Sequence, residues 1–167
     1  LVVGGNFENH GIVKMTMRTI DSYTAGNEPT NDEGGKGRGV IRFVGEHNVN
    51  FYCYSTTNLS QLIIDKGTDE TYRVTLFSSA EGNFGLLGKA TDFHVPDADN
   101  TPDNPVAIYK PLWLKNGTLE LTGNLHIYSL SEGGNDNFFI PLNGCLHLNG
   151  NNVKVDACRI NSSNCCL

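Results

Sequence analysis

The sequence predicts an all-β fold, an antiparallel β-sandwich of jelly-roll or Ig-like type with about eight to ten short strands. Apolar and polar residues alternate over short segments, which is typical of strands with one buried face. Turn-forming residues separate these segments at intervals of roughly 8–12 residues. Charged residues make up only 18% of the chain, and small polar residues take their place, which favours short strands over long helices. A β-barrel and a β-trefoil are the alternatives.

The composition fits one secreted domain. The 167 residues suit a single β domain over 1–167, ending in a polar, cysteine-bearing tail at 161–167. The net charge of −6 comes without a basic cluster, so the chain lacks what phosphate binding requires and is not expected to bind nucleic acid. No apolar run approaches the roughly 20 residues of a membrane span, so membrane insertion is not expected.

The first half of the chain alternates between strands and loops. Residues 12–19 form a half-exposed strand, and residues 21–38, with no apolar period, form a long loop. Residues 40–44 and 49–55 are expected to pair as a hairpin around Gly-Glu-His-Asn. In the second of these strands one face carries valine, phenylalanine and cysteine, and the other carries Asn50, Tyr52 and Tyr54. We interpret the tyrosine stripe as an ordinary solvent-facing surface.

The middle of the chain contains one predicted helical segment among further strands. Residues 58–65 form one or two helical turns, and residues 72–77 and 84–90 form strands. Three prolines exclude regular structure from residues 95–105. The dipeptide Gly-Asn recurs in turns at residues 82, 123 and 150, but in a chain this rich in both residues we do not interpret it as a repeat.

Residues 112–121 carry the sharpest local signal. Asn116-Gly117 is the two-residue loop favoured in type I′ hairpins, where both positions need a positive φ. Its register pairs leucine with leucine on one face and Trp113 with Glu120 on the other. A three-residue loop at 122–124 extends the sheet, so that Glu120 also faces His126. Residues 125–130 continue this sheet, residues from 138 resume it, and a last hairpin pairs 146–148 with 153–155.

This register predicts a binding face. Trp113, Glu120 and His126 form one row across three strands, and Lys115, Thr118 and Tyr128 form the next. An aromatic ring beside a carboxylate and an imidazole suits a sugar, because the ring stacks on the apolar face of a pyranose while the polar groups hold its hydroxyls. The alternative is that this face is covered and that Trp113 is simply buried.

The predicted function is therefore a secreted, non-catalytic recognition module that binds carbohydrate or a cell-surface glycoconjugate. Its ligand-binding residues are Trp113, Glu120, His126, Tyr128 and Lys115. A secreted protein-binding effector, inhibitor or adhesin domain, using residues 21–38 or 95–105, is the alternative, and a small hydrolase is the second. Glycoside hydrolysis requires two facing carboxylates, and Glu120 has no acidic partner on its predicted sheet.

No cofactor is expected, with one calcium candidate. Asp97, Asp99, Thr101 and Asp103 have the alternating oxygen spacing of a calcium loop. However, Pro102 stands at the sixth position, where such loops need glycine, and no glutamate follows at the twelfth. We therefore favour a plain turn.

The cysteines and sequons agree with an oxidising, extracellular location. The five cysteines are Cys53, Cys145, Cys158, Cys165 and Cys166. They fit no zinc spacing, and disulfides are the better interpretation. The odd number leaves at least one free or linked to a partner chain, and a Cys145–Cys158 bridge and a tether from Cys53 to the tail are both open. Asn58, Asn116 and Asn161 begin glycosylation sequons.

Overall fold

The computed structural model describes residues 1–16, 39–87, 111–127 and 138–155. Its secondary structure in these ranges consists of strands and one short 3₁₀ turn, which confirms the all-β class. Every pair of described strands runs parallel. The predicted antiparallel sandwich is therefore wrong.

The described strands follow one another in five successive coils. The first coil contains β1 (Val2–Val3), β2 (Phe7–Asn9) and β3 (Val13–Lys14). The second contains β4 (Val40–Val44), β5 (Val49–Cys53) and β6 (Thr57–Leu59). The third contains β7 (Gln61–Asp65), β8 (Arg73–Ser78), η2 (Glu81–Asn83) and β9 (Phe84–Leu86). The fourth contains β10 (Leu112–Leu121) and β11 (Leu125–Ile127), and the fifth contains β12 (Phe138–Phe139), β13 (Gly144–His147) and β14 (Val153–Val155).

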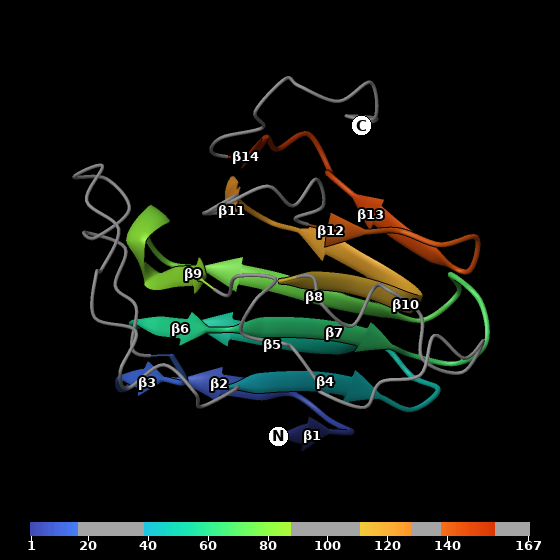
Figure 1. The fold of residues 1–167 in the computed structure, drawn as a ribbon, viewed down its shortest axis with the longest axis horizontal. Coiled ribbons are helices and arrows are strands. Elements are labelled where there is room, and N and C mark those ends of the chain that lie inside the picture. The colour runs from blue at the N-terminus through green and yellow to red at the C-terminus, as the bar shows by residue number, and fades with distance from the viewer. Residues whose placement is uncertain (17–38, 88–110, 128–137, 156–167) are drawn as a thin grey trace, which may run out of the picture.

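Each strand pairs with strands of the adjoining coils, so the chain winds as a parallel β-solenoid (Figure 1). We call its sides sheet A (β1, β4, β7, the first part of β10, β12), sheet B (β2, β5, β8, the second part of β10, β13) and sheet C (β3, β6, β9, β11, β14). Because β10 bends from sheet A into sheet B, these two sides form one nine-stranded sheet beside the five-stranded sheet C. The strands wrap around a shared core, as in the barrel alternative. However, a strand's neighbours come from other coils, not from the hairpins that a sandwich or β-trefoil requires.

Three predicted hairpins are instead corners of the solenoid. β4 and β5 exist as predicted, but β4 pairs with β1 and β7, whereas β5 pairs with β2 and β8. The chain passes Asn116-Gly117 without reversing, and only Gly117 has a positive φ, at 91°. β13 and β14 likewise belong to different sheets. The predicted helical segment at 58–65 is also wrong, because it contributes strands to β6 and β7.

The core consists of ladders of apolar side chains that continue from coil to coil. In sheet A, Ile41 lies beside Leu62 and then Leu112, and all three are fully buried. In sheet B, Phe51 lies beside Leu76, which lies beside Leu121. Alternation along each strand sends the intervening residues outward. The sequence therefore predicted correctly which face of β5 and β10 is buried.

Glycine and asparagine residues form the corners between sheets. The three Gly-Asn turns occupy the same corner, between sheets B and C, in the third, fourth and fifth coils. Asparagine side chains join neighbouring coils there: Asn151 Nδ2 donates to the Leu121 carbonyl at 3.2 Å, and Asn9 Nδ2 donates to the Thr56 carbonyl at 2.9 Å. Gly-Asn therefore marks this corner in the last three coils, although the sequence interpretation did not treat it as a repeat, whereas Gly5-Asn6 lies between β1 and β2.

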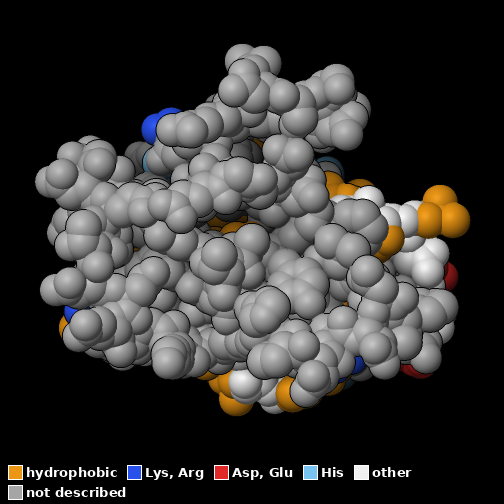
Figure 2. Space-filling view, viewed as in Figure 1, with side chains coloured by type: hydrophobic (Ala, Val, Ile, Leu, Met, Phe, Trp, Pro, Cys, Tyr) orange, Lys and Arg blue, Asp and Glu red, His pale blue; other side chains and the backbone are white. Residues whose placement is uncertain are grey.

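Exposed apolar side chains are concentrated at the two ends of the solenoid. Among the described residues, Leu1, Val2 and Ile12 of the first coil are exposed, as are Ile140, Leu142 and Leu148 of the fifth. Hydrophobic side chains are visible along the lower edge of the space-filling view, where the first coil lies (Figure 2). Middle coils bury such surface by stacking on their neighbours. Tyr54 is the exception, since it lies in the second coil and is still 41% exposed.

Candidate functional site

Tyr54 belongs to an aromatic patch on the outer face of sheet B. The patch consists of His10, which follows β2, Tyr52 and Tyr54 at the end of β5, and Phe77 of β8. The His10 and Tyr54 rings are stacked, with centroids 4.6 Å apart and planes at 15°. Tyr54 also stacks on Tyr52 at 5.6 Å, and Phe77 contacts both tyrosines at 6.0 and 5.6 Å. The four rings therefore form one contiguous surface.

The strand register brings these rings together. Tyr52 lies beside Phe77 on the next strand and beside Glu8 on the preceding one. Phe51 and Cys53 point into the core and are fully buried, so the residues that alternate with them face outward. An exposed cluster of aromatic rings costs solubility, and such patches commonly mark binding surfaces.

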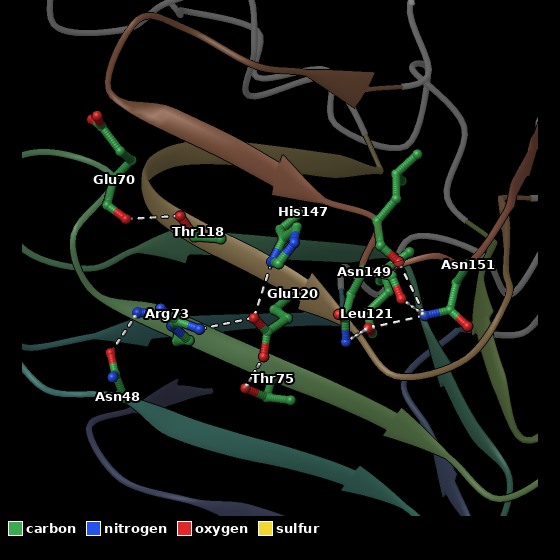
Figure 3. Close-up of polar contacts among 11 residues, drawn as sticks. Asn48, Glu70, Arg73, Thr75, Thr118, Glu120, Leu121, His147, Asn149 and Asn151 are labelled. Atoms are coloured by element: carbon green, nitrogen blue, oxygen red, sulfur yellow. Dashed lines mark hydrogen bonds and ion pairs between the residues drawn. The ribbon is translucent and has the colours of Figure 1, made fainter.

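A polar row centred on Glu120 continues this face into the later coils (Figure 3). Thr75, Glu120 and His147 lie side by side on β8, β10 and β13. Arg73 Nη1 donates to Glu120 Oε2 at 2.8 Å, and Thr75 Oγ1 donates to Oε1 at 3.3 Å. His147 Nδ1 lies 3.0 Å from Oε2. The carboxylate thus fixes the Arg73 and His147 side chains, which are 46% and 52% exposed.

A second glutamate–histidine pair lies at the other end of the face. His10 Nε2 is 3.4 Å from Glu8 Oε2, and both side chains are largely exposed. The tyrosines and Phe77 of the aromatic patch therefore lie between the Glu8–His10 pair of the first coil and the Glu120–His147 pair of the last two. Together they offer apolar ring surface, phenol hydroxyls, carboxylates, a guanidinium group and imidazole nitrogens on one face, which can both stack against and hydrogen-bond a polar ligand.

The structure separates the residues predicted to form the binding row. Trp113 lies on the outer side of sheet A, since Leu112 and Leu114 face the core. It is only 8% exposed, and its Nε1 has no hydrogen-bond partner among the described residues. His126 lies on β11 of sheet C, is 8% exposed and pairs in register with Lys154. The predicted row is therefore wrong, because β10 bends from sheet A into sheet B at Asn116-Gly117 and residues 122–124 form a further corner into sheet C instead of a hairpin loop.

The remaining predicted ligand residues have separate surroundings. Lys115 Nζ lies 5.9 Å from the centroid of the Trp113 ring. Tyr128 lies outside the described residues, as do segments 21–38 and 95–105, which the protein-binding alternative would use. Only Glu120 joins the face described above. The tyrosine stripe was visible in the sequence, whereas Arg73, Phe77 and His147 depend on the register between coils.

A charged cluster on sheet A holds three coils together. Asp65 of β7 accepts hydrogen bonds from Arg42 of β4 and, at 2.8 Å, from Asn116 Nδ2 of β10, and Lys115 Nζ lies 3.3 Å away. Burial acts to raise the pKa of the Asp65 carboxyl. The hydrogen bonds from Asn116 and Arg42, with the positive charges of Arg42 and Lys115, outweigh burial, so this pKa lies below its ordinary value. The cluster joins one carboxylate to two cations of neighbouring coils, and we assign it a structural role.

Asp65→Asn is expected to lower stability by about 1–3 kcal/mol at pH 7, because the ionised carboxylate accepts charge-assisted hydrogen bonds. A carboxyl whose pKa is lowered by folding stabilises the protein above the unfolded-state pKa, and this contribution is lost as pH falls through the folded-state pKa. Urea unfolding of both proteins from pH 7 to pH 3 should therefore converge at the acidic end. A difference that stays constant across this range would contradict the assignment.

Cys53 lies on the core face of β5, as predicted, whereas the described sequons are less exposed than surface turns would be. Cys53 is buried, and burial raises the pKa of its thiol to about 11 against a hydrogen bond with Thr57 that lowers it. Cys53 and Cys145 form no disulfide within the described residues. Asn58 is 4% exposed, and Asn116 uses its side-chain amide on Asp65. The predicted bridges and glycans stay predictions, because Cys158, Cys165, Cys166 and Asn161 lie outside the described residues.

Metal binding and membrane crossing find no support in the described part of the chain. No cluster of three or more His, Cys, Asp or Glu side chains there is arranged to hold a metal ion. The calcium candidates Asp97, Asp99 and Asp103 fall outside the described ranges. No helix in those ranges is long and apolar enough to cross a membrane. No family model matches the sequence, and comparison with curated proteins and with solved structures found no match.

Proposed function

We propose that the protein is a non-catalytic recognition module that binds carbohydrate through the outer face of sheet B. The observation that carries this proposal is the contiguous aromatic patch between two glutamate–histidine pairs. Aromatic rings pack against the apolar C–H faces of sugars, and carboxylates, imidazoles and phenols hydrogen-bond the hydroxyls. The proposal retains the ligand class and the extracellular location predicted from the sequence, and moves the site from Trp113 and His126 to Tyr52 and Tyr54.

The spacing of the carboxylates favours binding over glycoside hydrolysis. Glu8 lies on β2 and Glu120 on β10, with β5 and β8 between them. Three strand spacings place their backbones about 14 Å apart. Glycosidases that use two carboxylates hold them roughly 5–9.5 Å apart. Glu120 is in addition engaged by Arg73, Thr75 and His147, so that its two oxygens already contact neighbouring side chains.

Tyr54→Ala is expected to weaken glycan binding by about two- to tenfold, because one aromatic contact contributes roughly 0.5–1.5 kcal/mol. The measurement is a glycan array, followed by titration calorimetry on the strongest ligand. Val2→Ala is the matched control, since Val2 is also exposed, at 66%, but lies on sheet A, and it should bind like the wild type.

Trp113→Phe distinguishes this site from the one predicted by sequence. It should keep wild-type affinity if sheet B binds the ligand. Loss of binding in Trp113→Phe but not in Tyr54→Ala would assign the ligand to sheet A instead. A wild-type protein that binds no glycan on the array would refute the proposed function itself.

A further inference from the structure

We infer that the ligand is an uncharged polysaccharide chain that lies along the solenoid axis and contacts sheet B from the first coil to the fifth. This inference rests on the proposed function and specifies the ligand of the same site. Two features carry it: the distribution of the binding groups over the coils, and the balance of charge among them.

The binding groups are spread over the whole length of the solenoid. The first coil contributes Glu8 and His10, the second Tyr52 and Tyr54, the third Arg73 and Phe77, the fourth Glu120 and the fifth His147. Four spacings between neighbouring strands separate the first coil from the fifth, about 19 Å. One sugar ring cannot contact both ends of such a face, whereas a chain of several sugars can.

The polar side chains at the two ends of this face are exposed and can contact a ligand. His147 is half-exposed, and because its Nδ1 contacts Glu120, Nε2 is the ring nitrogen that can hydrogen-bond a hydroxyl group of a ligand. At the other end, Glu8 and His10 are 49% and 69% exposed. Polar groups at both ends and aromatic rings between them match a chain whose outer sugars accept or donate hydrogen bonds while its middle sugars stack on the rings.

The charge on this face disfavours an acidic polysaccharide. Its described groups comprise two carboxylates, Glu8 and Glu120, and one guanidinium, Arg73, which is already paired with Glu120. These three groups sum to a net negative charge, within a chain whose net charge is −6. A uronate or sulfate chain would approach unpaired negative charge and would find no free guanidinium group.

The test measures affinity against chain length. Titration calorimetry would use neutral gluco-, manno-, xylo- and N-acetylglucosamine oligosaccharides of one to six units, with oligogalacturonates as the acidic series. Affinity for at least one neutral series should rise tenfold or more from the monomer to the longest oligomer, and no acidic oligomer should bind more tightly. A monosaccharide that binds as tightly as its hexamer, or preference for the acidic series, would overturn the inference while leaving carbohydrate binding intact.

Variants at the two ends locate the chain. His10→Ala and His147→Ala should each reduce affinity for the hexamer by a larger factor than affinity for the dimer, because only the longer ligand reaches both ends. Val2→Ala, on sheet A, should change neither. Circular dichroism and thermal melts would verify that each variant is folded. Equal losses for dimer and hexamer in both end variants would overturn the extended arrangement, and absence of any glycan binding by the wild type would instead refute the proposed function.

Discussion

Replacing Gly117 with alanine is expected to destabilise the protein by about 3 kcal/mol or more. Gly117 has a φ of +91°, which L-residues rarely adopt. A Cβ there would lie 2.8 Å from the Tyr72 carbonyl oxygen and 3.0 Å from Lys66 Cβ. Both neighbours belong to the corner of the preceding coil, so neither can move without disturbing the stack. Backbone strain and steric overlap therefore act together.

Gly123→Ala is the matched control for this prediction. Gly123 also lies at a corner of the fourth coil, but a Cβ there would have no neighbour within 4 Å, and its φ is not in the positive range. Urea unfolding followed by circular dichroism should show a small change for Gly123→Ala and a large one for Gly117→Ala. Equal effects would mean that the corner at Gly117 is not packed against the preceding coil.

Gly117 also shows where sequence reasoning reaches its limit. A type I′ hairpin and a solenoid corner both place glycine at a positive φ after a polar residue. The two differ in which strands pair afterwards, and in the solenoid those strands come from other coils. Local sequence identified the special backbone position correctly, but it could not distinguish a reversal from a bend.

Side-chain direction was predicted well because it is a local property. Alternation along β5 and β10 correctly assigned Phe51, Leu112 and Leu119 to the core and Tyr52 and Glu120 to the outside. Strand pairing was predicted poorly because short connections suggested antiparallel neighbours, whereas parallel strands usually need long crossovers. In the solenoid, the other two sheets provide the crossover between consecutive strands of any one sheet.

The candidate site could likewise be predicted where it depends on side-chain direction, but not where it depends on strand pairing. The outward tyrosines were evident from the sequence, but the position of Tyr52 beside Phe77, next to the row of Thr75 and Glu120, depends on the register between coils. One sequence signal contained that register, the Gly-Asn turns at 82, 123 and 150. Aligning the chain on these turns places β9, β11 and β14 on one side of the solenoid, as the structure has them.

Phe51→Ala is expected to cost about 3–5 kcal/mol, the usual range for removing a fully buried phenylalanine. Phe51 has no exposed surface. Its ring contacts Phe7 of the first coil at 5.4 Å, Phe43 of sheet A at 5.2 Å and Phe84 of sheet C at 5.7 Å between centroids. A cavity at this position would therefore loosen contacts between coils as well as between sheets.

Tyr54→Ala tests the same strand from its outer side. Tyr54 also contacts three aromatic rings, but water already reaches its side chain, so its removal should cost roughly 1 kcal/mol or less. Domains of this kind have a total stability of about 5–15 kcal/mol, so urea unfolding separates the two variants clearly. Comparable losses of stability for both variants would contradict the assignment of Phe51 to the core and of Tyr54 to the surface. A large loss confined to Phe51→Ala would support a solenoid packed from within, whose outer rings are free to bind a ligand.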